Sequence, residues 1–179
     1  SLDYIGQIMG ERKESPVPFS FITRIQEDAT AKSKRKDITN LFQVKEVSSV
    51  VGMASTNELI VSFDSIDELK QVSERIKDYS NNDHAISCIS DFEEFKPRVS
   101  VVEETVNYKI KLVDYQNYEQ NVAMRRLLEQ TLNYHQIQYQ KTDYSEEFYV
   151  YKLKNLSKAM LDTLKGTDIY NALFSVEPM

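Results

Sequence analysis

The sequence predicts an α+β fold of two successive units, each with an antiparallel sheet and helices on one face. Three observations support this. Segments of alternating apolar and polar residues, typical of half-buried strands, recur in both halves of the chain. Segments with apolar residues at helical spacing lie between them. A polar run around Pro97 interrupts the pattern near the middle of the 179 residues, which suffice for two small domains.

Residues 1–44 are predicted to be a helical lead-in. Residues 15–18 contain two prolines, which favour a helix start. Phe19, Ile22 and Ile25 then recur at helical spacing, so we expect a helix that continues toward Leu41. The basic residues within 32–36 are interpreted as a solvated helix face, because no aromatic residues are interleaved with them.

Residues 45–100 are predicted to form a first, trimmed unit with the order strand, strand, helix, strand. Strands at residues 47–54 and 58–63 flank a hairpin connection at residues 55–57. Ser65 and Glu68 have the spacing of a capping box at a helix start. Residues 85–89 are predicted to be the next strand.

Residues 101–179 predict a more complete unit. Residues 106–112 alternate strictly, as in a half-buried strand, and Asn117 with Gln120 predicts the start of a helix. Strands are expected from Ile137 and over residues 148–153. Ser157 and Gly166 then predict the two ends of a last helix before a closing strand at 172–176. This is the split βαβ, or ferredoxin-like, order, so we expect two tandem ferredoxin-like subdomains.

Composition argues against several classes of partner. The formal charge of −6 disfavours broad affinity for nucleic acid or anionic membranes, because both would be repelled. No apolar run approaches the roughly 20 residues that span a bilayer. No signal peptide is recognisable at the first residues, which favours an intracellular location. We therefore expect neither a nucleic-acid nor a membrane partner.

The sequence offers little for catalysis. No nucleophile elbow, zinc-protease motif, glycine-rich phosphate loop or paired-cysteine motif occurs. His84 and His135 lie in different halves near predicted element ends. Cys88 is the only cysteine, and the acidic residues that follow it would not activate a thiol. The prediction is a non-catalytic chain without a cofactor or metal.

Three aromatic residues, Phe148, Tyr149 and Tyr151, cluster on a predicted strand. RNA-recognition modules stack bases on such residues, and a basic segment then comes directly before the strand. Here Glu146 and Glu147 occupy that position. We therefore expect these rings to pack into the core or against a protein partner.

The closing segment resembles the end of a subtilisin propeptide. Residues 153–157, the following helix, and residues 174–179 match a ferredoxin-like unit that ends on an apolar strand followed by Glu-Pro, here Val176-Glu177-Pro178. Residues 107–112 fit the start of such a unit. Residues 59–65 are similar to the extra N-terminal region of longer, intracellular bacterial subtilisin-like peptidases. The resemblance covers most of residues 45–179 in element order, whereas the catalytic Asp, His and Ser motifs are absent.

The resemblance implies an intramolecular chaperone or inhibitor of a protease domain that follows in the same polypeptide. The open face of its sheet would contact that domain. The acidic connection with Asp143, Glu146 and Glu147 would cap helix N-termini of the protease, beside Phe148, Tyr149 and Tyr151. Alternatively, these carboxylates are ordinary turn residues.

The last residues carry a second implication of the resemblance. Val176, Glu177, Pro178 and Met179 would lead toward the active-site cleft in an extended form. The alternative for these residues is a simple linker. The alternative for the chain is a tandem ferredoxin-like regulatory or interaction module that senses a small ligand or dimerises through sheet edges.

Overall fold

A computed structural model describes residues 5–8, 15–26, 32–44, 47–48, 50–78, 85–87, 89–143 and 149–179. The chain divides into two units, Ser1–Phe95 and Lys96–Met179. The predicted separate lead-in over residues 1–44 is therefore corrected, because its residues belong to the first unit. The boundary after residue 100 is moved to Phe95.

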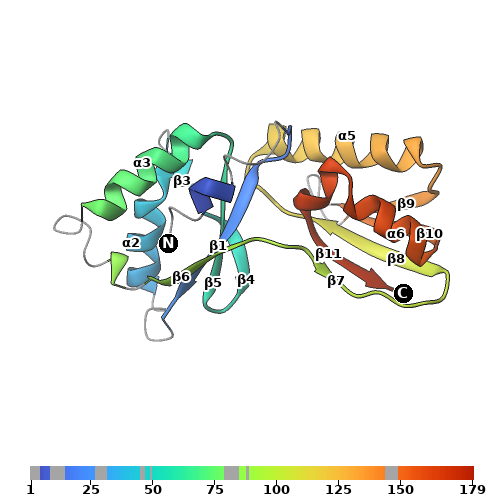
Figure 1. The fold of residues 1–179 in the computed structure, drawn as a ribbon, viewed down its shortest axis with the longest axis horizontal. Coiled ribbons are helices and arrows are strands. Elements are labelled where there is room, and N and C mark those ends of the chain that lie inside the picture. The colour runs from blue at the N-terminus through green and yellow to red at the C-terminus, as the bar shows by residue number, and fades with distance from the viewer. Residues whose placement is uncertain are drawn as a thin grey trace. The chain divides into compact units, whose positions relative to one another are not determined.

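The first unit is a four-stranded antiparallel sheet with helices α2 and α3 on one face (Figure 1). The strand order is β4-β5-β1-β6, and β2 and β3 form a separate two-stranded antiparallel sheet. In chain order the elements are β1 (Phe19–Ile25), α2 (Lys32–Leu41), β2 (Gln43–Val44), β3 (Val47–Ser48), β4 (Val50–Ser55), β5 (Glu58–Phe63), α3 (Ile66–Lys77) and β6 (Ile89–Glu94).

Strand β1 replaces the helix predicted from Phe19. It lies between β5 and β6, and every residue except Arg24 is buried. A strand that is buried on both faces loses the alternation of apolar and polar residues. The remaining apolar residues then recur at a spacing that imitates a helix, which explains the wrong prediction.

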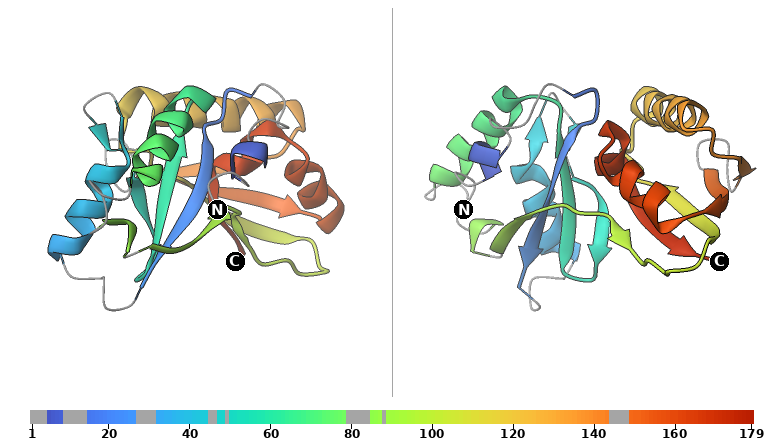
Figure 2. Two further views of the ribbon diagram at one scale, coloured as in Figure 1. Left: turned by 60° about the vertical axis from the view of Figure 1, so that its left-hand side comes forward. Right: turned by 45° about the vertical axis from the view of Figure 1, so that its right-hand side comes forward.

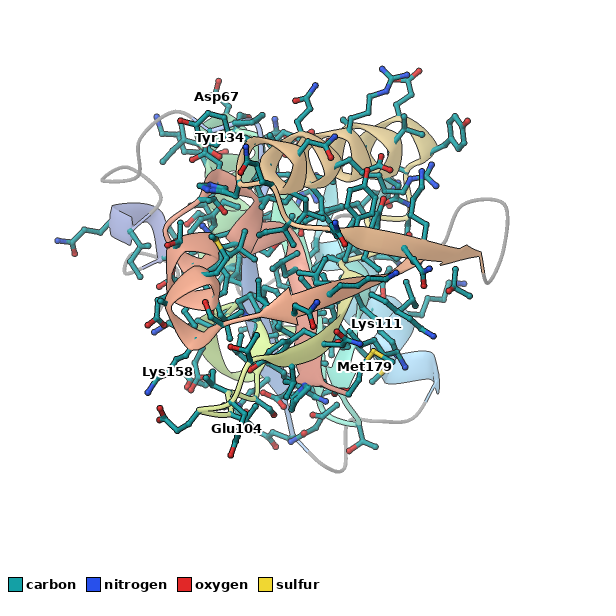
Figure 3. All side chains as sticks on the ribbon, turned by 90° about the vertical axis from the view of Figure 1, so that its right-hand side faces the viewer. Asp67, Glu104, Lys111, Tyr134, Lys158 and Met179 are labelled. Carbon is teal, nitrogen blue, oxygen red and sulfur yellow. The ribbon has the colours of Figure 1, made fainter. Side chains whose placement is uncertain are left out.

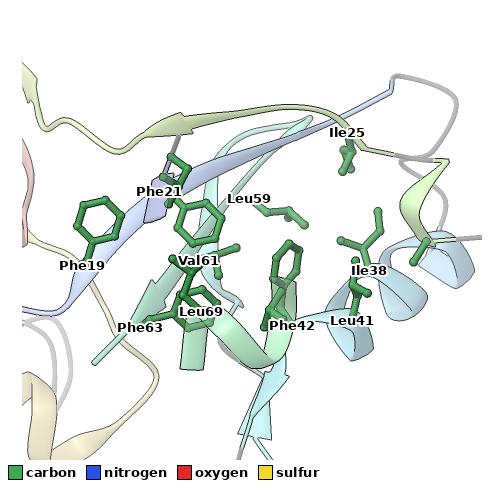
Figure 4. Packing of buried hydrophobic residues seen from close by; sticks show 13 residues of the cluster. Phe19, Phe21, Ile25, Ile38, Leu41, Phe42, Leu59, Val61, Phe63 and Leu69 are labelled. Atoms are coloured by element: carbon green, nitrogen blue, oxygen red, sulfur yellow. The ribbon is translucent and has the colours of Figure 1, made fainter. Parts of the chain in front are cut away.

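Aromatic packing organises the core of the first unit (Figure 4). The Phe21 ring centroid lies 6.2 Å from that of Phe42, 5.5 Å from that of Phe63 and 6.0 Å from that of Phe92. Helices α2 and α3 add buried aliphatic residues to this cluster, among them Ile38, Leu41, Leu69 and Val72. The sheet and both helices therefore share one core.

Local predictions in this unit had mixed outcomes. The hairpin is confirmed, since β4 ends at Ser55 and β5 begins at Glu58. The α3 cap is also confirmed, because the Glu68 N–H donates to Ser65 Oγ at 3.4 Å. The strand predicted at residues 85–89 is wrong: residues 85 and 86 are helical and β6 begins at Ile89. A short apolar run alone does not separate helix from strand.

The second unit has a five-stranded sheet in the order β7-β11-β8-β10-β9, with β7 parallel to β11 and the other pairs antiparallel. Helices α5 and α6 lie on one side of its strands (Figure 2). The elements are β7 (Arg98–Val99), β8 (Val106–Leu112), α5 (Tyr118–Tyr134), β9 (Tyr139–Asp143), β10 (Tyr149–Leu156), α6 (Lys158–Lys165), the 3-10 helix η2 (Asp168–Ala172) and β11 (Leu173–Pro178).

The predicted helix caps of this unit are confirmed. The Gln120 N–H donates to Asn117 Oδ1 at 2.9 Å, and the Met160 N–H donates to Ser157 Oγ at 3.1 Å. Gly166 is the C-cap of α6. These side chains satisfy backbone N–H groups that have no partner within the helix.

Apart from β2, β3, β7, the 3-10 helix η2 and the short helical turns at residues 5–8 and 85–86, the described parts of the two units share one order of elements: strand, helix, two strands, helix, strand. In each sheet the first strand lies between the third and the fourth, and the second lies at an edge beside the third. The first unit was predicted to be a trimmed copy, but it has the same number of main strands and helices as the second unit has in this shared order. The α+β class with antiparallel sheets is confirmed.

Candidate interaction surface

Strand alternation in β8 and β10 gathers lysines on the sheet face away from the helices. Tyr108, Ile110 and Leu112 of β8 are buried, while Lys109 and Lys111 between them are half-buried. In β10, Lys152 and Lys154 alternate with the buried residues Tyr151, Leu153 and Leu156. We call Lys109, Lys111, Lys152 and Lys154 the lysine face; Lys111 is labelled in Figure 3.

The register brings these charges together. Lys152 stands directly opposite Lys109, and Lys111 stands opposite Val150. On the other side of β8, Glu177 of β11 is opposite Lys109. Val150 of β10 and Ser175 of β11 flank Lys111 on its two sides and are buried. Among the described residues, no ion pair is formed by any member of the lysine face.

The lysine face includes an unfavourable pair. Like charges directly opposite each other on a sheet are destabilising, by an amount in the range of about 0.2–1 kcal/mol for such cross-strand pairs. Lysines on edge strands commonly protect a sheet from aggregation. Here β8 and β10 each have a neighbour on both sides. Edge protection therefore does not explain these lysines.

A wide, open polar depression adjoins Lys154. Its volume is about 540 Å³, and it lies where α5 ends and β9 begins. It is lined by Asn133, Gln136, Ile137, Gln138, Tyr139, Gln140 and Lys154. The amide groups can both donate and accept hydrogen bonds, and Lys154 adds one positive charge.

The predicted acidic connection is only partly visible. Asp143 is the last residue of β9, and its backbone pairs with that of Tyr149 at the start of β10. Glu146, Glu147 and Phe148 lie outside the described residues. The predicted contact of this connection with a partner stays a prediction.

Tyr151 was predicted to lie in the partner interface, but it lies in the core. Its side chain is fully buried, and its ring centroid lies 5.8 Å from that of Tyr139. It stands opposite Ile110 in the core-facing row of the sheet. A residue in that row cannot touch a partner at the surface. Period-two alternation with Leu153 was the sequence signal for this placement.

The closing residues belong to the sheet. Val176 is buried opposite Ile110, and β11 continues to Pro178, two residues beyond the predicted end at Val176. Glu177 is exposed, and Met179 is 58% exposed (Figure 3). The Met179 N–H donates to the Asn107 carbonyl at 2.9 Å. The residues predicted to form a tail are thus held by β8; their path to a protease cleft stays a prediction.

The first sheet carries an ion-pair cluster on its face away from the helices. The Arg24 guanidinium donates to both Glu93 carboxylate oxygens, at 2.6 and 2.8 Å, and lies 3.4 Å from Glu58 and 3.8 Å from Asp91. Hydrogen bonding to Glu93 raises the pKa of Arg24 above its ordinary value. This cluster links β5, β1 and β6, and its single cation is already engaged.

Residues considered for catalysis are not brought together. His135 caps α5, where its N–H donates to the Thr131 carbonyl at 3.1 Å, and its ring packs edge-on against Tyr134. His84 and Cys88 lie outside the described residues. Within the described part of the chain, no three His, Cys, Asp or Glu side chains are placed to hold a metal ion.

Among the described helices, none has the length and apolar character that crossing a membrane requires. No protein-family model, no curated protein and no solved structure matches this chain.

Proposed function

We propose that this chain is a non-catalytic, propeptide-like region of a subtilisin-like serine protease, built from two tandem ferredoxin-like units. The shared order of elements and strands supports the ferredoxin-like assignment, because it agrees with the order expected of a split βαβ unit. Sequence resemblance in the second unit supports the protease assignment.

One observation carries the proposal. The motif of the resemblance, Val176-Glu177-Pro178, lies on β11, the closing strand of the second βαββαβ unit. That is the position which the resemblance assigns to it. The motif therefore coincides with the expected element and is not an isolated match of three residues.

The proposed mechanism is that of an intramolecular chaperone or inhibitor. The second sheet contacts the protease domain through its face away from the helices. The carboxylates of Asp143, Glu146 and Glu147 accept hydrogen bonds from helix N-termini of that domain, where the helix dipole favours negative charge. Binding of this kind stabilises the folded protease domain by mass action and restricts access to its active site.

An inhibition assay tests this function. The purified chain is added to the protease domain encoded in the same reading frame, and hydrolysis of a peptide substrate is followed. We expect inhibition that saturates with the chain, and weaker inhibition by Glu146→Lys/Glu147→Lys. The control, Glu94→Lys/Glu104→Lys, makes the same charge change at exposed positions. An absence of inhibition together with an absence of binding contradicts the proposal.

A second candidate function is a regulatory module that binds a small ligand. The open polar depression beside β9 favours it, because its amide groups and Lys154 can form hydrogen bonds with a ligand. Its amide-rich lining fits a polar ligand. Thermal stabilisation of the chain by polar metabolites, abolished by Gln138→Ala/Gln140→Ala, would support this candidate.

A further inference from the structure

We propose that the lysine face binds a carboxylate-rich surface of a protein partner. This inference rests on the register of β8 and β10 and not on the protease assignment. It specifies the chemistry of the partner, which the resemblance does not.

The geometry of the face fits a row of carboxylates. Lysines two apart on one strand are about 7 Å apart, and neighbouring strands are about 4.8 Å apart. Acidic residues on successive helical turns, about 5.4 Å apart, or at alternate positions of an extended segment have similar spacings. Several ammonium groups can therefore engage carboxylates of one acidic segment at once.

The conflict between Lys109 and Lys152 is the strongest sign of an anionic partner. These residues stand opposite each other on inner strands, and only Glu177 offers a facing carboxylate in the described register. An acidic partner would turn this local repulsion into attraction. Residues that lower stability without a role in packing are expected at functional surfaces.

A protein surface fits better than a nucleic acid. Strand alternation places Tyr151 on the opposite, helix-covered face. The described residues of the lysine face thus include no ring for stacking of bases.

Fluorescence anisotropy with labelled poly-L-glutamate tests the proposal on the full chain. We expect saturable binding that weakens with salt, as contacts between exposed charges do. The variant Lys109→Gln/Lys111→Gln/Lys152→Gln/Lys154→Gln should bind about tenfold more weakly, given the modest energy of each ion pair between partly exposed side chains.

The control variant Lys36→Gln/Lys70→Gln/Lys77→Gln/Lys96→Gln removes the same number of charges from exposed positions elsewhere. Its affinity should stay within about twofold of the unchanged chain, as expected for charges outside the contact. Lys109→Gln/Lys152→Gln serves as a milder variant with an intermediate loss, and circular dichroism verifies that each variant is folded.

Three results would overturn the proposal. The first is that poly-L-glutamate does not bind even at low salt. The second is that the two quadruple variants lose affinity equally, which would reflect net charge alone. The third is that a single-stranded RNA oligomer binds through the lysine face more tightly than poly-L-glutamate does. None of these results depends on whether a protease domain exists. Failure here is therefore distinguishable from failure of the proposed function.

Discussion

At the scale of single residues, the Lys109–Lys152 pair places two like charges directly opposite each other on neighbouring strands. Replacing Lys152 by Glu should turn repulsion across β8 and β10 into attraction and raise the free energy of unfolding by about 0.5 kcal/mol. Urea unfolding followed by circular dichroism measures this change. Lys96→Glu, at an exposed position outside the strands, is the charge-matched control. Equal effects of the two substitutions would mean that the cross-strand pair has no particular cost.

Tyr151 provides the contrasting case of a buried residue. Tyr151→Ala should lower the free energy of unfolding by about 3–5 kcal/mol, because a large core side chain is lost and a cavity remains. Tyr134→Ala should change it by less than about 0.5 kcal/mol, since that ring is 83% exposed. Similar thermal stabilities of the two variants would contradict the core position of Tyr151.

The sequence limits what can be predicted about single residues. The alternation of Tyr108, Ile110 and Leu112 with lysines identified one face of β8 correctly. The lysine face was missed, because it needs β8 and β10 to be neighbours in the sheet, and strand pairing is not encoded within either strand. Tyr151 was misassigned because adjacent aromatic residues were grouped along the chain, whereas strand geometry separates them by face.

At the scale of elements, side-chain caps define where helices begin. Asn117→Ala should lower the free energy of unfolding by about 1 kcal/mol, because the Gln120 N–H loses its acceptor. Asn117→Ser should restore most of this loss, since a hydroxyl also caps well. Thermal unfolding of both variants measures the effect. A Ser variant as unstable as the Ala variant would show that capping is not the cause.

Strand β11 should be structural up to Pro178. Deleting residues 176–179 removes the buried Val176 side chain and the backbone bond from the Ser100 N–H to the Val176 carbonyl. We expect a loss of at least about 2 kcal/mol of stability in the second unit. Deletion of Met179 alone should cost less than about 0.5 kcal/mol. Unchanged unfolding of the longer deletion would show that these residues are a free tail.

Helices and strands were predictable from the sequence where one face is buried and the other is exposed. The strict alternation of β8 and the caps at Asn117 and Ser157 were read correctly from the sequence. Strand β1 was not, because both of its faces are buried in the middle of a sheet. The region before β6 was ambiguous, because a run as short as residues 85–89 fits either a helix or a strand.

At the scale of the whole molecule, the two units should be separate folding units. Each has its own sheet and its own helices, and the boundary follows Phe95. A fragment of residues 96–179 should therefore give dispersed amide resonances and a cooperative unfolding transition of its own. A fragment that remains unfolded would show that the second unit depends on the first.

We propose that the chain is part of a subtilisin-like protease. Its most direct test is the sequence of the reading frame that contains this chain, read beyond the codon for Met179. We expect a catalytic domain with the Asp, His and Ser motifs of subtilisins. A frame that stops at Met179, or continues into an unrelated domain, would contradict it and make the regulatory module the better interpretation.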